Sequence, residues 1–243
     1  MTRRSSFIAR AGTALVACGA LTVALAGSTR QHVATARTVA RTVDTTAQGA
    51  DAQVLLGRRL VLNHDCAGCH GGQYPSNTSE PWLAGRGSPA DEFLIGPCAT
   101  QPNAKPCFHT HARNLTPDNE TGLGRFTERQ IFNALRYGLR PGETPDVDIT
   151  STTPGTGNFP VHPRYLAPPM PWPGWRYMSD EELHAIAAYL KRGVKPVHNR
   201  IPDSEGPPDF WASAYTPDKI GPYPPAPFPT ANEHTLTAVG ARP

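Results

Sequence analysis

Prolines divide this chain of 243 residues into short segments that can be regular and long segments that cannot. Nine prolines fall between residues 141 and 173, and ten more fall between residues 200 and 243. Because proline interrupts helices and cannot donate a backbone hydrogen bond to a sheet, neither segment can form long regular elements. The sequence therefore predicts a mainly α domain with a small core, long Pro/Gly-rich loops and an irregular C-terminal tail. It argues against a long helical bundle or a coiled coil.

Three segments carry the hydrophobic spacing of amphipathic helices. They are residues 53–65, 127–137 and 179–192. Ser179 and Glu182 have the spacing of a capping box at the start of the third helix, and Gly193 is suited to end it. Thr127 and Gln130 have the same spacing at the start of the second helix. Between these helices, no segment alternates for long enough to predict a sheet.

The first 26 residues are typical of a secretory signal peptide. Three arginines precede an apolar run from Ala11 to Gly27, which contains the small-residue cleavage pattern Ala24-Leu25-Ala26. We expect cleavage after Ala26; an uncleaved membrane anchor and a lipid-modified Cys18 are the alternatives. All three place the protein outside the cytoplasm.

The charge balance changes when this segment is removed. The whole chain has 23 basic and 20 acidic residues, and three of the arginines belong to the segment, which has no acidic residue. The mature chain is therefore formally neutral. A neutral chain lacks the basic surface of a nucleic-acid-binding protein, so we expect no nucleic-acid partner.

The sequence Cys66-Ala67-Gly68-Cys69-His70 has the C-x-x-C-H spacing that attaches c-type haem. Two thiols three residues apart on a helical turn face the same way, so both can add to the vinyl groups along one porphyrin edge. His70 follows directly and is carried beneath the ring, where its imidazole can ligate iron. The small residues Ala67 and Gly68 would let the backbone approach the macrocycle closely.

Three other interpretations compete with haem attachment. A thioredoxin-like redox pair lacks the surrounding βαβ pattern and leaves the histidine unexplained. Half of a zinc site would need a second ligand pair. The candidates for that pair are Cys98, Cys107, His109 and His111. The third interpretation is that the C-x-x-C-H pattern occurs in this sequence by chance. Export favours haem, because thioether cytochromes are matured outside the cytoplasm.

A low-spin electron-transfer haem needs a second axial ligand, and Met170 is our candidate. Apart from the initiator, the only methionines are Met170 and Met178. Met170 lies in a proline-rich loop before the third predicted helix, and prolines lower the entropy cost of holding a side chain in place. Met178 adjoins the helix cap, where we expect it to pack against the helix. His162 is the remaining alternative ligand.

These residues make the chain resemble a class I c-type cytochrome, close to the cytochrome c domains that serve periplasmic alcohol and aldehyde dehydrogenases. The matching stretches are residues 57–71, 112–142 and 168–197. The resemblance implies a class I cytochrome c fold, in which helices surround the haem and the first and last helices cross. At that crossing, Gly57 and Leu60 would meet Tyr189 and Leu190.

The resemblance also implies a ligand set and exposes two departures. In such proteins the axial ligands are the histidine and the methionine that correspond to His70 and Met170. Related dehydrogenase subunits often carry three haem domains, whereas this chain has one C-x-x-C-H motif. The segment 73–111 is enlarged and brings Cys98 and Cys107, which can form a disulfide in an oxidising compartment; a free pair or metal ligation are the alternatives.

Two further features allow more than one interpretation. The family motif Asn114-Leu115-Thr116-Pro117 lies either near the haem edge or in an Asx- or ST-turn before a proline. Trp172 and Trp175 pack either on the porphyrin or in the protein core. The sequence leaves both questions open.

The sequence thus predicts four regions. They are a signal peptide or uncleaved anchor at 1–26, a flexible linker at 27–51, a cytochrome c domain at 52–199 and a Pro-rich tail at 200–243. We expect an exported, periplasmic protein that binds one haem c through Cys66 and Cys69, with membrane association possible through its N-terminus.

The expected function is single-electron transfer from a dehydrogenase to a terminal acceptor, with no catalytic residue in this chain. Its partners would then be a redox donor and a redox acceptor, with a periplasmic dehydrogenase as the candidate donor. The alternative is a haem enzyme or sensor with an open or displaceable sixth iron ligand, such as a peroxidase-like or gas-binding protein.

Overall fold

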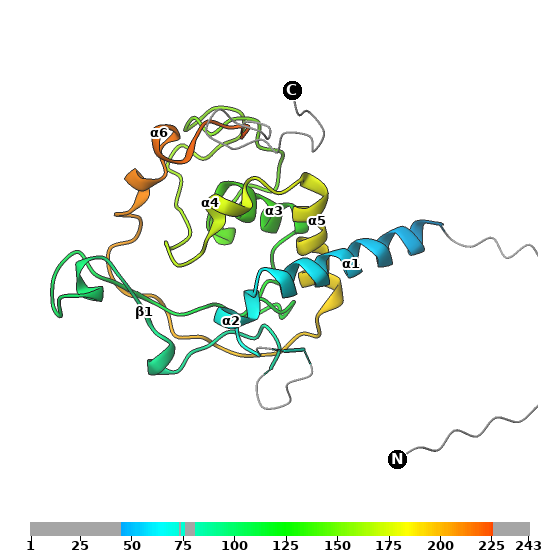
Figure 1. Ribbon diagram of the computed structural model, residues 1–243, viewed down its shortest axis with the longest axis horizontal. Helices are drawn as coiled ribbons and strands as arrows, with labels where there is room; N and C mark the ends of the chain where they lie inside the picture. The colour runs from blue at the N-terminus through cyan, green and yellow to red at the C-terminus, as the bar shows by residue number, and fades with distance from the viewer. Residues whose placement is uncertain (1–44, 73, 76–80, 226–243) are drawn as a thin grey trace, which may run out of the picture. The chain divides into compact units, whose positions relative to one another are not determined.

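The computed structural model describes residues 45–72, 74–75 and 81–225, with side chains described from residue 52 onward (Figure 1). The expected signal peptide at 1–26, most of the expected linker and the end of the tail at 226–243 lie outside the described residues. No helix among the described residues is both long enough and apolar enough to cross a membrane.

Most of the regular elements among the described residues are helices, as expected for a cytochrome c fold. The helices are α1 (Thr45–Asn63), α2 (Cys66–His70), α3 (Glu128–Tyr137), α4 (Trp172–Trp175), α5 (Asp180–Ala188) and α6 (Pro217–Ile220). A π-helical segment, Tyr189–Gly193, continues α5, and 3₁₀ turns lie at Pro89–Asp91, Pro97–Ala99, Pro141–Glu143 and Ala212–Ala214. α1 begins at Thr45, inside the expected linker, because a helix already formed gains one hydrogen bond for each residue added.

Both predicted capping boxes are confirmed. At the start of α3, the Thr127 hydroxyl accepts from the Gln130 amide, and the Gln130 side chain accepts from the Thr127 amide, both at 3.1 Å. Ser179 and Glu182 make the same exchange at the start of α5. These contacts satisfy backbone donors that a helix leaves unpaired at its start, so the sequence specified both helix starts locally.

α1 and α5 pack closely against each other, as Figure 1 shows. A Cβ atom at Gly57 would collide with the carbonyl group of Ala185 and with the side chain of Tyr189. Ala185 itself is completely buried. The helix crossing that the resemblance implies is therefore present, and it depends on a glycine in α1 facing small residues in α5.

A two-stranded antiparallel sheet lies in the enlarged segment, where the sequence predicted no strands. β1 (Phe93–Ile95) pairs with β2 (Phe108–Thr110), with Leu94 opposite His109. Strands of three residues are too short to show a recognisable alternation. The connection between them is closed by a disulfide between Cys98 and Cys107, which confirms the expected pairing.

The disulfide also removes Cys98 and Cys107, two of the four candidates for the second ligand pair of a zinc site. Among the residues that the structure describes, no group of three or more His, Cys, Asp or Glu side chains is placed to hold a metal ion. The zinc interpretation thus keeps only His109 and His111 as candidates for its second ligand pair.

The described part of the tail lies over the domain and contributes to its core. In Figure 1 it runs from the end of the helical region past β1 to α6. Glu205 forms two backbone hydrogen bonds with His109 of β2, at 2.8 and 2.9 Å. Trp211 is buried and packs edge-on against Phe108, with ring centroids 5.1 Å apart. The predicted boundary at residue 199 therefore does not mark the end of the folded core.

The helix crossing gives a direct stability prediction. Gly57→Ala should lower the free energy of unfolding by about 1 to 3 kcal/mol, because the added methyl group must displace the backbone of α5. Chemical denaturation followed by circular dichroism measures this change. Gly142→Ala is the matched control: an added Cβ there meets nothing within 4 Å, so its effect should stay below about 0.5 kcal/mol. Equal effects of the two substitutions would contradict the close crossing.

Candidate functional site

The five residues of the C-x-x-C-H motif form the whole of α2, which follows α1 almost directly. Asp65 separates the two helices in a left-handed conformation, with φ of 49° and ψ of 41°. Cys66 is half-buried and Cys69 is exposed. Residues three apart on a helix are neighbours, so the two thiols share one face as expected. Burial raises the pKa of the Cys66 thiol to about 12, which disfavours the thiolate that a metal–thiolate site requires.

His70 has the environment of a metal-binding histidine. Its side chain is buried, with 9% exposed, and its Nδ1 atom lies 2.7 Å from the backbone carbonyl oxygen of Arg113. A carbonyl can only accept, so Nδ1 carries the proton and Nε2 carries the lone pair. Burial lowers the pKa of His70, which favours the neutral imidazole. Within the described residues, Nε2 has no hydrogen-bond partner. A neutral imidazole held at Nδ1 by a carbonyl is the usual form of a histidine ligand.

Backbone hydrogen bonds fix the end of α2 to the segment that follows it. The His70 carbonyl accepts from the Gly85 amide at 2.7 Å, and the Gly71 carbonyl accepts from the Leu83 amide at 2.9 Å. Gly71 has a φ of 93°, which side-chain-bearing residues rarely adopt. The turn after the motif therefore requires glycine.

The small residues between the two cysteines have different contacts from those expected. Ala67 is buried in the main hydrophobic cluster of the protein. A Cβ atom at Gly68 would collide with the carboxylate of Asp65. Ala67 thus has a packing reason to be small, whereas the Asp65 carboxylate could move away from a side chain at Gly68; the close porphyrin approach stays a prediction.

Met170 packs against the same hydrophobic cluster as Cys66 and Ala67. Backbone bonds hold its loop: the Met170 amide donates to the Ala167 carbonyl at 2.9 Å. Met178 is also half-buried against this cluster, whereas His162 is exposed. The structure thus brings Met170 and the motif to one core. The ligand role of Met170 stays a prediction, because Met178 packs there as well.

The Asn114 side chain has a structural role in an Asx-turn. It is buried, with 1% exposed, and its Oδ1 atom accepts from the amide and hydroxyl groups of Thr116 at 2.9 and 2.8 Å. Its Nδ2 atom donates to Thr121 and to the carbonyl oxygen of Val197. These bonds tie the motif to the chain after α5. Of the two interpretations that the sequence allowed, the turn before a proline is therefore observed.

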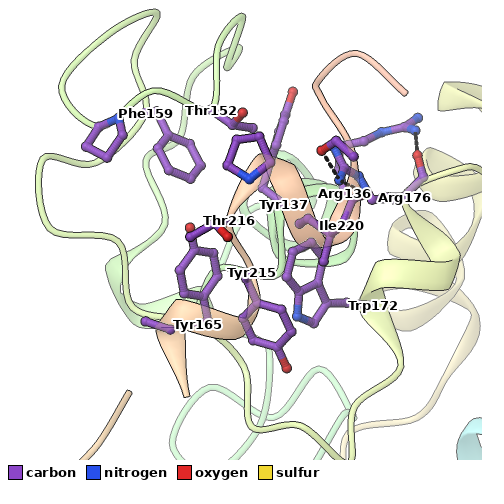
Figure 2. Close-up of a pocket in the computed structure, with 14 residues that line it drawn as sticks. Arg136, Tyr137, Thr152, Phe159, Tyr165, Trp172, Arg176, Tyr215, Thr216 and Ile220 are labelled. Atoms are coloured by element: carbon purple, nitrogen blue, oxygen red, sulfur yellow. Dashed lines mark hydrogen bonds between the residues drawn. The ribbon is translucent and has the colours of Figure 1, made fainter. Parts of the chain in front are cut away.

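Trp172 belongs to an aromatic cluster formed with the tail. Figure 2 shows it beside Tyr165 and Tyr215, around a cavity of about 140 Å³. Its ring is stacked parallel to Tyr165, with centroids 5.9 Å apart, and meets Tyr215 edge-on at 4.9 Å. With 2% exposed, Trp172 fills the core here. Trp175 contacts the His64 ring edge-on at 6.1 Å and packs against the main cluster.

Sequence reasoning missed Arg113, which supplies the acceptor for His70. The acceptor is a backbone carbonyl, which every residue type carries, so no side-chain pattern could have identified it. Only the fold brings it to His70, which lies 43 residues earlier in the chain.

Comparison with known proteins gives a consistent set of relatives. The gluconate 2-dehydrogenase cytochrome c subunit of Pantoea cypripedii is 28% identical over 183 residues, which cover 70% of this chain and 32% of the relative. The fructose dehydrogenase cytochrome subunit of Gluconobacter japonicus is 27% identical over 63% of this chain and 24% of its own length. The cytochrome c subunit of alcohol dehydrogenase (quinone) from Gluconobacter oxydans is 28% identical over 66% of this chain and 26% of its own length.

The chain resembles the cytochrome c subunits of dehydrogenases. No protein-family model matches it. It spans between 24% and 32% of the length of these three curated relatives. The similarity therefore covers most of this chain but only a part of each relative.

The Asx-turn predicts the effect of removing its side chain. Asn114→Ala should lower the free energy of unfolding by about 1 to 3 kcal/mol, because it leaves the buried Thr116 amide without its acceptor and removes one of the two donors to the Val197 carbonyl. Chemical denaturation measures the loss. Asn119→Ala, at an exposed asparagine nearby, should change stability by less than about 0.5 kcal/mol. A near-neutral Asn114→Ala would refute the structural role.

Proposed function

We propose that this chain is an exported electron-transfer cytochrome in which Cys66 and Cys69 bind one haem c through thioether bonds. The observation that carries the proposal is the environment of His70. The histidine of the C-x-x-C-H motif is buried and donates from Nδ1 to a carbonyl, which would leave the Nε2 lone pair available to ligate a metal. The similarity to cytochrome c subunits supports the same cofactor.

The donor set fits a low-spin haem. We assign the two axial positions to His70 and Met170, a nitrogen and a soft sulfur ligand that together suit iron cycling between its ferric and ferrous states. Bound haem supplies the one-electron chemistry. The chain contributes by orienting His70 through the Arg113 carbonyl, by holding Met170 in a proline-rich loop, and by packing the main hydrophobic cluster around Cys66. We assign no side chain a role in substrate chemistry.

We further propose that the electron donor is a dehydrogenase outside the cytoplasm. This step rests on the names of the relatives, each of which is the cytochrome subunit of a dehydrogenase. The basic and apolar N-terminal segment supports export and leaves membrane association through the N-terminus as part of the proposal.

Covalent attachment is the first test of this function. The matured protein should keep its haem through boiling in detergent, because thioether bonds are covalent, and a denaturing gel stained for haem peroxidase activity detects it. Replacing Cys66 and Cys69 with alanine should abolish the stain. Replacing Cys98 and Cys107 with serine is the matched control, since it removes two cysteines outside the motif and should preserve the stain. An unstained wild-type protein would eliminate the c-type assignment.

The sixth ligand is tested by comparing the two methionines. Met170→Ala should retain covalent haem, lose the methionine-to-iron charge-transfer band of the ferric spectrum and lower the reduction potential, because the lost thioether favours ferrous iron. Met178→Ala should leave both the band and the potential nearly unchanged. The reverse pattern would assign the ligand to Met178. A high-spin ferric spectrum in the wild type would instead support the haem enzyme or sensor.

A further inference from the structure

Two hydrogen bonds hold His70 in place, and both partners lie outside α2. The Nδ1 atom donates to the Arg113 carbonyl at 2.7 Å, and the His70 carbonyl accepts from the Gly85 amide at 2.7 Å. The first bond holds the ring and the second holds the backbone. The orientation of His70 therefore depends on how firmly Gly85 and Arg113 are held.

A short segment of the tail, residues 201–204, contacts both partners. The Nη1 atom of Arg113 donates to the carbonyl oxygens of Pro202 and Ile201 at 2.7 and 3.3 Å, and its Nη2 atom donates to the Ser204 hydroxyl at 2.6 Å. The Ile201 side chain, with 6% exposed, covers Gly85 so closely that a Cβ atom there would lie 2.8 Å from it.

One of the three acceptors around Arg113, the Ser204 hydroxyl, is held by β2 as well. The Ser204 hydroxyl also shares a hydrogen bond of 2.7 Å with the Thr110 hydroxyl of β2. A planar guanidinium that meets three acceptors holds its own backbone more firmly than a flexible surface cation does. The Arg113 carbonyl thus belongs to a residue anchored at its side chain by the tail.

We propose that Arg113 and the 201–204 segment form a positioning strap that sets the strength of the His70 hydrogen bond and, through it, the reduction potential. The inference rests on the proposed haem function. A strong hydrogen bond at Nδ1 makes the imidazole a more basic ligand, which stabilises ferric iron. Loosening the strap should therefore raise the potential.

The effect of the Arg113 charge on the reduction potential must be separated from its effect on the position of His70, because losing the charge lowers the potential whereas loosening His70 raises it. Removing a positive charge near the iron disfavours the ferrous form and lowers the potential. Arg113→Lys keeps the charge but cannot span the three acceptors, and Ser204→Ala removes one acceptor without changing any charge. Arg200→Gln is the charge control: Arg200 is exposed, lies beside the segment, and bonds to none of the residues that the structure describes.

The experiment uses the full-length, haem-loaded protein and two measurements. Spectroelectrochemical titration gives the reduction potential, and NMR gives the exchange rate of the His70 ring N–H in the ferrous state. We expect Arg113→Lys and Ser204→Ala to raise the potential and to accelerate exchange of this proton, at least tenfold for Arg113→Lys. The Leu183 amide in the buried face of α5 should exchange at its wild-type rate. Arg200→Gln should leave ring N–H exchange unchanged and should not raise the potential.

Three results would contradict the proposal that Arg113 and the 201–204 segment position His70. Wild-type potentials and exchange rates in both Arg113→Lys and Ser204→Ala would show that the segment does not act on His70. Equal acceleration at His70 and Leu183 would show a global loss of stability. If a further variant, Arg113→Gln, lowers the potential by as much as Arg200→Gln does, while Arg113→Lys leaves it unchanged, the effect is one of charge alone. A wild-type protein without covalent haem would instead refute the proposed function.

Discussion

The close contact between α1 and α5 is the constraint on which the rest of the structure depends. Gly57 lies against the backbone of Ala185, and no side chain fits between the two helices at that point. Because α2 follows α1 after only two residues, the position of α1 also determines where the Cys66–His70 motif lies. One backbone contact thus places the candidate site relative to the core, while the turn at Asp65 sets its orientation.

The C-terminal tail also contributes contacts that hold the domain together. Its residues pair with β2, surround Trp172 in an aromatic cluster and bind the Arg113 side chain. A segment so rich in proline loses little conformational entropy on folding, so these scattered contacts are enough to hold it without regular structure. The tail consequently acts as part of the domain, and it reaches the site through both Arg113 and Gly85.

The relatives are dehydrogenase subunits about three to four times as long as the part that this chain matches. In the function proposed here, the motif-bearing helix, the buried histidine and the methionine loop belong to one haem-binding module. The enlarged segment with its disulfide and the folded tail add contacts around that module.

The sequence by itself determined the features that depend on neighbouring residues: both capping boxes, the C-x-x-C-H helix, and the proline-rich loops. Such features are encoded locally because each contact joins residues three or four positions apart. The three-residue strands, the course of the tail and the carbonyl that holds His70 were decided only by the tertiary structure. Their partners lie tens of residues away or are backbone atoms common to every residue, and a backbone carbonyl leaves no mark in the sequence.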